Sequence, residues 1–487
     1  MARSVGFGAV NKPKQRFELR RAARRQSESG AVATPTTPPP QDESASPPGL
    51  GARRLAVNMI ETVVRDRRPL ARLSSDADGA ADTGAMEPRD RAFAHLMAMT
   101  VLRRYGTLSA VLDRFIERPL PEAGGRARTI MLVGAAQILL LGTPVHAAVD
   151  LAVEQCRRQR SASPYAKLAN AVMRRVAKEG PAVLAALDTT TLDVPVWMYR
   201  RWATTYGDAR ARQIASASLV EAPLDLSVKR DADAWAEKLG GRVLATGSVR
   251  LGEHARVDAL PGYAEGAWWV QDAAAALPVR LLGDVTGLRV ADLCAAPGGK
   301  SAALAAAGAR VTAVDVSAQR LDVVRRNMAR LGLSDAVDIV AADIESWTST
   351  EAFDAVLLDA PCSATGTIRR HPDILHLKRF DDIARSAVVE ARLLARVAEL
   401  VKPGGVLVYC TCSLEPEEGE QRVAQFLTEH AEFTRDPVVS SDVAGHAEWI
   451  TSSGDLRTFP FQSPTVSPEQ SNGGMDGFYA ARLRRRV

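Results

Sequence analysis

The sequence predicts an α/β chain in which a helical unit precedes a domain built on a parallel sheet. From Gly51 to about Gly180, apolar residues recur every three or four positions, which is the period of amphipathic helices. After Gly287 the pattern becomes apolar strand, tight loop and helix, repeated as in parallel sheets covered by helices on both faces. A shorter stretch of mixed pattern lies between them. We therefore expect an arm, a helical domain, a small α+β segment and an α/β domain, at 1–50, 51–182, 190–275 and 276–487.

The composition is that of a globular chain. With 487 residues, 46% of them apolar, the chain is long enough for about three domains and can bury substantial cores. Its longest apolar runs, such as 138–141, are far shorter than the ~20 residues of a membrane span. The arginine-rich start lacks the apolar core of a secretory signal. We therefore expect a cytoplasmic protein that does not contact membranes.

The first 50 residues are expected to be a disordered, basic and proline-rich arm. Residues 1–30 hold eight Lys or Arg against two Glu, whereas the net charge of the whole chain is +5. Residues 31–50 contain six prolines among Ser and Thr, which favours an extended linker. A basic arm can contact a phosphate backbone without sequence preference, and it can equally serve as a solubilising tail. The composition favours neither role.

Two prolines predict helix starts within the helical unit. Thr143-Pro144 and Ser163-Pro164 each place a capping side chain before a proline at the first helical position. The second helix is expected to end at Gly180. The lone His146 is interpreted as a structural residue at a helix start, not a ligand. The first helix is expected to bury one apolar face, made of Val145, Ala148, Val149, Ala152, Val153 and the core thiol Cys156.

Aromatic residues gather at both ends of the 190–275 segment. Such residues can stack on bases at a nucleic-acid site, but they more often fill a core. We therefore assign them to the core and give them no catalytic role. They are Trp197, Tyr199, Trp202 and Tyr206 at its start and Trp268-Trp269 at its end.

Five apolar segments predict the strands of the parallel sheet, namely 289–293, 311–314, 337–340, 355–358 and 406–409. Ligands of such sheets bind at the carboxyl ends of the strands. An aspartate at a strand end can also merely cap the helix that follows. That explanation is strained for four successive strands, whose ends carry Asp292, Asp315, Asp343 and Asp359.

The loop after the first strand indicates a nucleoside cofactor without phosphates. It is neither GxGxxG nor the phosphate-binding GxxxxGKS or GxxxxGKT loop, which disfavours NAD and ATP. Its small residues let the backbone approach a ligand, and the helix expected from Ser301 would present free N–H groups to a carboxylate. S-adenosylmethionine has a ribose and an adenine but no phosphate, and Asp315 is placed to accept hydrogen bonds from a ribose.

Two cysteines predict the chemistry. Cys362 follows Asp359-Ala360-Pro361, and Cys412 lies in Thr411-Cys412-Ser413 after the fifth strand. Carbon 5 of cytosine is a poor nucleophile, and it accepts a methyl group only after a thiolate has added to carbon 6. A methyltransferase acting there needs one attacking cysteine and a base that removes the carbon 5 proton. The five cysteines form neither a disulfide framework nor a zinc-binding pattern, so no metal is expected, and Cys410 is interpreted as a core thiol beside a displayed Cys412.

Together these motifs resemble a known family. Asp292–Lys300 reads DLCAAPGGK, Asp359–Gly366 reads DAPCSATG, and Thr411-Cys412-Ser413 follows the fifth strand. The chain is similar to bacterial RNA (cytosine-5) methyltransferases that modify small-subunit ribosomal RNA and are related to the NOP2/Sun proteins. The helical unit resembles the NusB-like RNA-binding domain that precedes their catalytic domain. The resemblance covers nearly everything after Gly51.

The resemblance implies a Rossmann-like, S-adenosylmethionine-dependent methyltransferase domain. It makes Cys412 the nucleophile and Cys362 the residue that helps to release the product. Asp359 would bind both the cofactor and the target base. Lys300, Arg369 and Arg370 are candidates for activating the thiolate. The implied cofactor-binding residues are Cys294, Ala295, Ala296, Pro297, Gly298, Gly299, Lys300, Asp315, Arg320, Asp343 and Asp359.

The resemblance also implies a substrate and a partner. The expected reaction methylates carbon 5 of a cytosine in unassembled or partly assembled small-subunit rRNA, at the cytosine-967-type site of 16S rRNA. The enzyme is expected to act as a monomer. One alternative is a transfer RNA substrate. Another is a non-catalytic NusB-like RNA-binding or antitermination factor, which would bind RNA without the cofactor.

The chain departs from the family pattern at three places. Gly419 stands where the family usually has Asn, and Glu390 where it often has Gln. The His that is common before the C-terminal Asp476-Gly477-Phe478 is absent. We expect these departures to affect local positioning and RNA contacts, and not the cysteines or the cofactor aspartates.

Overall fold

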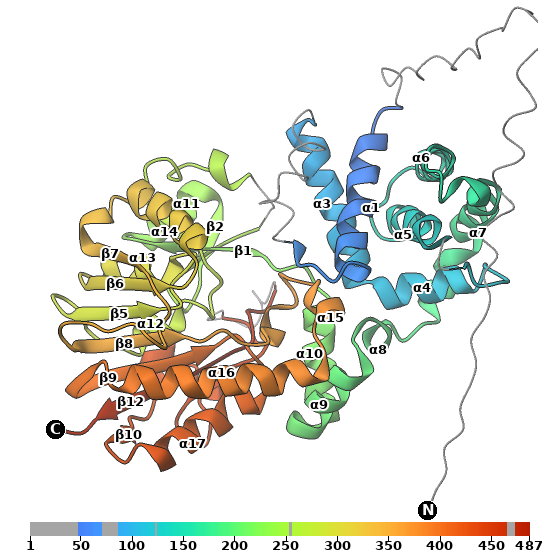
Figure 1. Ribbon diagram of the computed structural model, residues 1–487. Coiled ribbons are helices and arrows are strands. Elements are labelled where there is room, and N and C mark those ends of the chain that lie inside the picture. The colour runs from blue at the N-terminus through green and yellow to red at the C-terminus, as the bar shows by residue number, and fades with distance from the viewer. Residues whose placement is uncertain (1–46, 71–85, 122–123, 253–255, 465–472) are drawn as a thin grey trace, which may run out of the picture. The chain divides into compact units, whose positions relative to one another are not determined.

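The computed structural model describes residues 47–70, 86–121, 124–252, 256–464 and 473–487 (Figure 1). The predicted basic and proline-rich arm lies outside the described residues except for its last four. Within the described part of the chain, no helix is long and apolar enough to cross a membrane.

The N-terminal part of the described chain is helical, as predicted. Its helices pack around one apolar core that includes Met97, Ile130 and Cys156, each at most 1% exposed. Cys156 is therefore a core residue, as expected. The helices are α1 (Leu50–Val64), α3 (Pro88–Arg103), α4 (Tyr105–Asp113), α5 (Gly125–Leu139), α6 (Val145–Arg158) and α7 (Ala166–Ala185).

The predicted start of helix α6 is wrong by one residue. Pro144 has an extended ψ of 127° and is the residue before the helix, and no side chain caps this end. The predicted buried face is correct except at Val145, which lies in the open first turn and is 47% exposed. His146 is also exposed there, and no cluster of metal-ligating side chains occurs among the described residues.

The predicted start and end of helix α7 are also wrong. Ser163–Tyr165 forms a separate 3-10 turn, and the α-helix begins at Ala166. The helix continues through Gly180 and Pro181 to Ala185. Gly180 does not end the helix. It allows α7 to pack closely against α5, because a Cβ atom at Gly180 would lie 3.0 Å from Leu139 Cδ2.

The middle segment begins with three α-helices, followed by a small antiparallel sheet and a fourth α-helix beside it. The aromatic prediction is confirmed for Trp202 and Trp268, which are fully buried. The helices are α8 (Thr189–Asp193), α9 (Val196–Tyr206) and α10 (Asp208–Ser218). The sheet has the order β2-β3-β1-β4, with α11 (Ala232–Leu239) packed beside it, and its strands are β1 (Leu224–Val228), β2 (Gly241–Val243), β3 (Val249–Leu251) and β4 (Trp268–Val270).

The C-terminal part is built on a mixed eight-stranded sheet with the order β10-β12-β9-β8-β5-β6-β7, in which β11 also pairs with β12. The five predicted strands are confirmed as a parallel array: β5 (Arg289–Leu293), β6 (Arg310–Asp315), β7 (Val337–Ala341), β8 (Phe353–Asp359) and β9 (Val401–Thr411). The sequence prediction missed the antiparallel edge, formed by β10 (Phe433–Arg435), β11 (Leu456–Thr458) and β12 (Phe478–Arg485).

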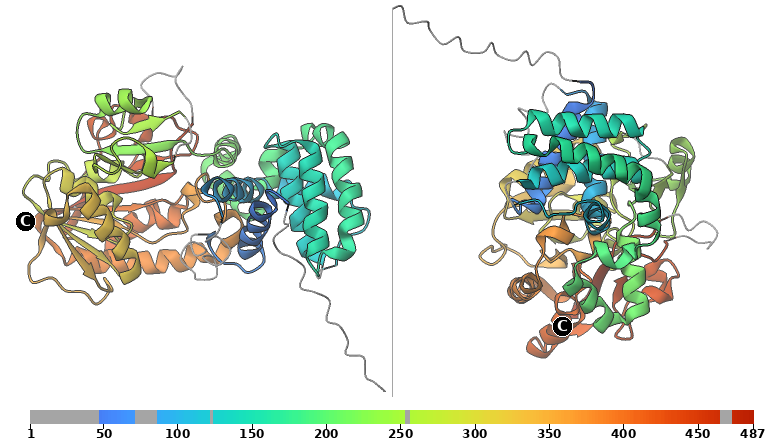
Figure 2. Two further views of the ribbon diagram at one scale, coloured as in Figure 1. Left: turned by 90° about the horizontal axis from the view of Figure 1, so that it is seen from above. Right: turned by 90° about the vertical axis from the view of Figure 1, so that its right-hand side faces the viewer.

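Helices cover both faces of this sheet, which confirms the predicted α/β class (Figures 1 and 2). Apolar side chains of α14, such as Val324 and Met328, join the core of one face. Side chains of α16, such as Leu394 and Val397, join the core of the other. The helices of this part are α12 (Leu277–Arg280), α13 (Gly299–Ala306), α14 (Ala318–Leu331), α15 (Ile374–Leu377), α16 (Phe380–Ala398) and α17 (Glu420–Glu429).

Candidate active site

The glycine-containing loop after β5 is held open by the end of the neighbouring strand. Asp315, at the end of β6, accepts hydrogen bonds from the Ala296 N–H (3.2 Å) and the Ser317 N–H (2.9 Å). Arg320 donates to the Ala296 carbonyl (2.5 Å) and forms an ion pair with Asp315 (3.4 Å). Gly298 has φ +99°, and a Cβ atom there would lie 3.1 Å from Val324 Cγ1, so the position requires glycine. These contacts hold the loop in one conformation, in which Ala295, Ala296 and Gly298 are buried and Pro297 is exposed.

Helix α13 begins at Gly299, two residues before the expected Ser301. The loop thus leads directly into a helix whose first N–H groups lack intrahelical partners and can bind a carboxylate. Its second residue, Lys300, is buried, and its Nζ lies 2.6 Å from Asp359 Oδ2 at the end of β8. The helix start and the end of β8 are therefore joined by an ion pair.

The four aspartates occupy different environments. Asp292 lies inside β5, where burial raises the pKa of its carboxyl to about 7 and Ser301 donates a hydrogen bond to it. Asp315 is buried and Asp359 is partly exposed. Asp343 is exposed, two residues beyond β7, and accepts from the Glu345 N–H (3.0 Å). Asp315 and Asp343 thus do bind the backbone that follows them, whereas Asp359 pairs with Lys300.

This set of donors and acceptors fits a nucleoside cofactor with a carboxylate. The start of α13 offers N–H groups, and Asp315 and Asp343 offer oxygen acceptors at the ends of two neighbouring strands.

Two thiols meet where β8 and β9 end. The strands are parallel neighbours with Asp359 opposite Cys410, and the loops beyond them bring the sulfur atoms of Cys362 and Cys412 to 3.5 Å from each other. Both side chains are partly exposed. Cys410 is fully buried, and its thiol points to Asp359 Oδ1 (3.7 Å). The expected contrast between a core Cys410 and a displayed Cys412 is thus present.

The contact between the two sulfur atoms affects the pKa of Cys362. The hydrogen bond to Cys412, followed by burial, raises the pKa of the Cys362 thiol well above its ordinary value. The Cys362 side chain is therefore protonated near neutral pH, and its S–H group can donate a hydrogen bond to the Cys412 sulfur.

The backbone around Cys412 is braced by two other segments. The Gly366 N–H donates to the Cys412 carbonyl (3.0 Å), and the Gly477 N–H donates to the Gly366 carbonyl (2.9 Å). A Cβ atom on Gly366 would lie 1.9 Å from the Gly477 carbonyl oxygen, so only glycine fits. Helix α9 supports the continuation of this loop, because Tyr206 donates to the Leu414 carbonyl (2.5 Å).

A buried glutamate links the two cysteine loops. One carboxyl oxygen of Glu418 accepts from the Ser363 N–H (2.8 Å), and the other accepts from the hydroxyls of Ser363 and Ser413. Glu390 of α16 is fully buried and faces Glu418, and burial, followed by Glu418, raises the pKa of Glu390 to about 9. The departure at Glu390 therefore lies in the buried cluster around Glu418, which joins the two cysteine loops.

A second buried cluster surrounds Arg369. Its guanidinium bridges Asp272 (2.6 Å) and Asp476 (3.1 Å), and the Asp476 N–H donates to Asp272 (2.9 Å). Arg370 also binds Asp476 (2.7 Å). Burial lowers the pKa of Arg370, but Asp476 and other acidic groups, with a contribution from Cys412, outweigh it and raise that pKa. All three proposed activating cations are therefore paired with carboxylates, Lys300 with Asp359, Arg369 with Asp272 and Asp476, and Arg370 with Asp476.

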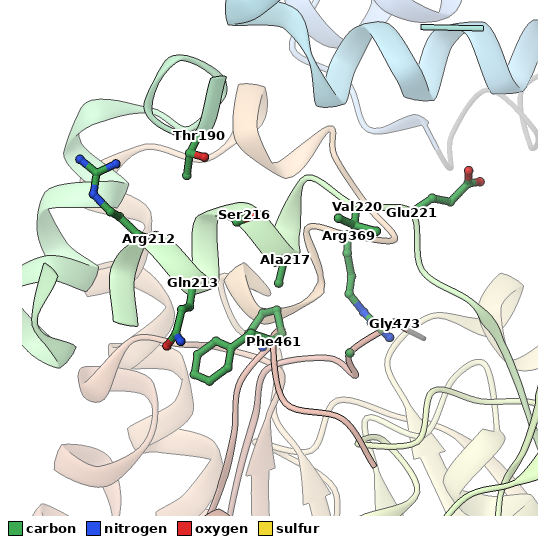
Figure 3. A pocket seen from close by; sticks show the side chains of 12 residues that line it. Thr190, Arg212, Gln213, Ser216, Ala217, Val220, Glu221, Arg369, Phe461 and Gly473 are labelled. Atoms are coloured by element: carbon green, nitrogen blue, oxygen red, sulfur yellow. The ribbon is translucent and has the colours of Figure 1, made fainter. Parts of the chain in front are cut away.

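A cavity of about 530 Å³ opens beside Arg369. Figure 3 shows α10 side chains on one wall and Phe461 opposite them, with the Arg369 side chain reaching toward Gly473. The cavity therefore extends from the Arg369 cluster along α10. Its lining residues are Thr190, Arg212, Gln213, Ser216, Ala217, Val220, Glu221, Arg369, Pro460, Phe461, Gly473 and Gly474.

Comparison with known proteins gives the family. A family model described as 16S rRNA methyltransferase RsmB/F matches residues 280–484, and one described as NusB family matches residues 50–178. The ribosomal RNA small subunit methyltransferase B of Xanthomonas campestris is 36% identical over 420 residues, covering 82% of this chain and 92% of that relative. The protein of the same name from Klebsiella pneumoniae is 35% identical over 453 residues, covering 90% of this chain and 99% of that relative. The chain belongs to the RsmB/F family.

Membership in the RsmB/F family confirms the resemblance found in the sequence. It also confirms the enzyme class, an RNA (cytosine-5) methyltransferase, and the cofactor, S-adenosylmethionine. Among solved structures, that of PH0851 superposes with a TM-score of 0.69 at 21% identity, covering 91% of this chain and 100% of that one. This similarity supports the fold.

Three acidic residues of the site, Asp272, Glu418 and Asp476, were assigned no role from the sequence. Asp272 and Asp476 are separated by 204 residues, and no local pattern relates them. Glu418 lies in a run of acidic residues, and such runs are typical of solvent-exposed segments. Glu390 was noted only as a departure, but its spacing offered a signal. It falls on the apolar stripe of α16 with Ile383, Ala387, Leu394 and Val397.

Proposed function

We propose that this RsmB/F enzyme methylates carbon 5 of a cytosine in 16S rRNA, at the cytosine-967-type site, through a covalent bond between Cys412 and carbon 6. The observation that carries the proposal is the 3.5 Å separation of the Cys362 and Cys412 sulfur atoms beyond two parallel strands. Methylation of an exocyclic nitrogen has no use for two adjacent thiols. Methylation of carbon 5 uses one thiol to attack and another group to help release the product.

In the proposed reaction, each residue of the site has a separate role. Cys412 attacks carbon 6 as a thiolate, and Arg370 supplies the positive charge that interacts with it. Asp359 accepts from the amino edge of the cytosine and is kept in place by Lys300. After methylation the carbon 5 proton leaves to a base, and the bond between Cys412 and carbon 6 breaks. Cys362, a thiol beside Cys412, assists this release.

The cofactor site is proposed at the ends of β5 to β8. S-adenosylmethionine supplies an electrophilic methyl group when it is bound. The loop from Cys294 to Gly299 would contact it through backbone groups, Asp315 would accept from the ribose, and Asp343 would contribute a further acceptor. Arg320 holds the loop by its bond to Ala296, and Lys300 orients Asp359.

The helical domain and the cavity beside Arg369 are proposed to hold the RNA. A NusB-family model matches residues 50–178, and the cavity offers Arg212, Gln213 and an aromatic ring at Phe461 for nucleotides that flank the target. One unpaired cytosine would be splayed from the strand toward Cys412. We propose that the enzyme acts as a monomer, without a metal, on rRNA in the cytoplasm.

Methyl transfer to rRNA made by transcription in vitro tests the proposal. The enzyme is incubated with tritiated S-adenosylmethionine and unmodified 16S rRNA, and the product is read by bisulfite sequencing. We expect one cytosine to become resistant to conversion, at the 967-type position. A label on transfer RNA alone, or a label without a bisulfite-resistant cytosine, would contradict the proposal.

A further inference from the structure

Glu418 lies at the junction of the two cysteine loops. It ends the short 3-10 helix η8 (Pro416–Glu418) and is fully buried. Its carboxylate accepts hydrogen bonds from Ser363, the residue after Cys362, and from Ser413, the residue after Cys412. The hydroxyls of Ser363 and Ser413 are also 3.1 Å apart. One carboxylate thus contacts the next residue beyond each sulfur.

The surroundings of Glu418 favour a single negative charge at this place. The titratable groups that interact with Glu418 are Glu390 of α16, Tyr409 of β9, Glu415 of its own loop and Cys362, and Arg422 of α17 and Cys412 interact with Glu390. Two buried carboxyls close together do not both ionise. Glu418 accepts three hydrogen bonds from Ser363 and Ser413, whereas burial of Glu390 outweighs its interactions with Tyr409 and Arg422. Burial also raises the pKa of Glu418, but its three hydrogen bonds oppose that shift, so Glu418 is the better candidate for the carboxylate, and Glu390, with a pKa of about 9, for the neutral acid.

We infer that Glu418 is a positioning residue: by binding both loops at once, it sets the separation of the Cys362 and Cys412 sulfur atoms. This inference rests on the proposed function. The two sulfurs must serve the same pyrimidine ring, one bonded to carbon 6 and the other assisting release. A displacement of about 1 Å at such a site can cost roughly a hundredfold in rate. The cofactor loop lies at the ends of β5 and β6 and makes no hydrogen bond to Glu418.

The consequence is a selective loss of chemistry. In Glu418→Ala, the rate of covalent bond formation should fall by about a hundredfold, whereas the affinity for S-adenosylmethionine should stay within about twofold. In Glu418→Gln, the amide oxygen still accepts from the Ser363 N–H and the amide N–H group can donate to a serine hydroxyl. This conservative variant should therefore recover the rate to within about tenfold of the wild type.

Two further variants keep the inference testable if Glu418→Ala does not fold. Ser363→Ala and Ser413→Ala each remove one hydroxyl from the carboxylate, and each should slow bond formation by roughly tenfold. Glu417→Gln is the matched control. Glu417 is the neighbouring acid of η8, is 37% exposed and binds Arg201, not the cysteine loops. This variant should form the covalent bond at the wild-type rate.

The experiment follows the covalent complex with an rRNA fragment that carries 5-fluorocytosine at the target. Fluorine cannot leave carbon 5 as a proton does, so the complex accumulates and its rate is read from denaturing gels. S-adenosylmethionine affinity is measured in parallel by calorimetry. If the wild-type enzyme forms no complex through Cys412, the proposed function fails. If it does so but Glu418→Ala reacts equally fast, or loses cofactor affinity to the same extent as rate, the positioning role is overturned.

Discussion

The sulfur atoms of Cys362 and Cys412 lie 3.5 Å apart, although the two residues are separated by 50 positions in the chain. The adjacency follows from the parallel pairing of β8 and β9, which sets Asp359 opposite Cys410 and sends both following loops to the same edge of the sheet. Glu418 and Gly366 then join these loops to each other. The sheet thus brings the two thiols together, and the loop contacts fix their spacing.

Replacement of Asp315 should weaken cofactor binding. In Asp315→Ala the loop loses the acceptor for the Ala296 N–H, and the ribose loses its proposed partner. A hydrogen bond to a charged group is worth about 1.5–3 kcal/mol, so the dissociation constant of S-adenosylmethionine should rise roughly tenfold to a hundredfold. Isothermal titration measures it. Asp338→Ala, on the exposed side of β7, is the control, and an equal loss in both variants would refute the assignment.

Replacement of Arg369 should destabilise the fold. In Arg369→Met, Asp272 and Asp476 stay buried without the cation that bridges them. Removing one partner of a buried ion pair costs about 3–5 kcal/mol, and urea denaturation of the full chain measures it. Arg385→Ala breaks an ion pair on the surface of α16 and should leave the midpoint unchanged. Equal midpoints for the wild type and Arg369→Met would show that the cluster is not a stabilising element.

Glu390 should make the stability of the protein depend on pH. Burial, then Glu418, raises its pKa from 4.5 to about 9, so the folded state holds a proton that the unfolded state releases above pH 4.5. This contribution therefore lowers stability as pH rises from about 4.5 to 9. Glu390→Gln keeps the shape of the neutral acid and removes the titration. Its melting temperature should exceed that of the wild type at pH 8.5 but not at pH 5, and a constant difference at both pH values would contradict the account.

The strands were predictable because each is a short apolar run followed by a polar loop. β5 and β7 match their predicted segments to within one residue at each end. The antiparallel edge was not predicted, because β12 joins the sheet only through pairing with β9, far away in the sequence. The end of α7 was missed because Gly180 serves close packing against Leu139, and a glycine used for packing looks the same in sequence as one that ends a helix.

The thiols and aspartates of the site were predictable because they follow strands within a few residues. The residues that support them were not. Arg369, Asp272 and Asp476 form one cluster from three distant segments, and a partner of this kind is visible only once the sheet is assembled. Glu418 lies close to Cys412 in sequence, but an acidic run gives no sign that one of its members points inward.

The most direct test of the account compares two cysteine variants on unmodified 16S rRNA with S-adenosylmethionine. Cys362→Ala keeps the nucleophile and loses the group that assists release, so it should accumulate a covalent RNA complex that migrates slowly on denaturing gels. Cys412→Ala should form no complex and lose turnover by roughly a thousandfold or more. A covalent complex formed by Cys412→Ala, or turnover near the wild-type rate in that variant, would contradict the central claim.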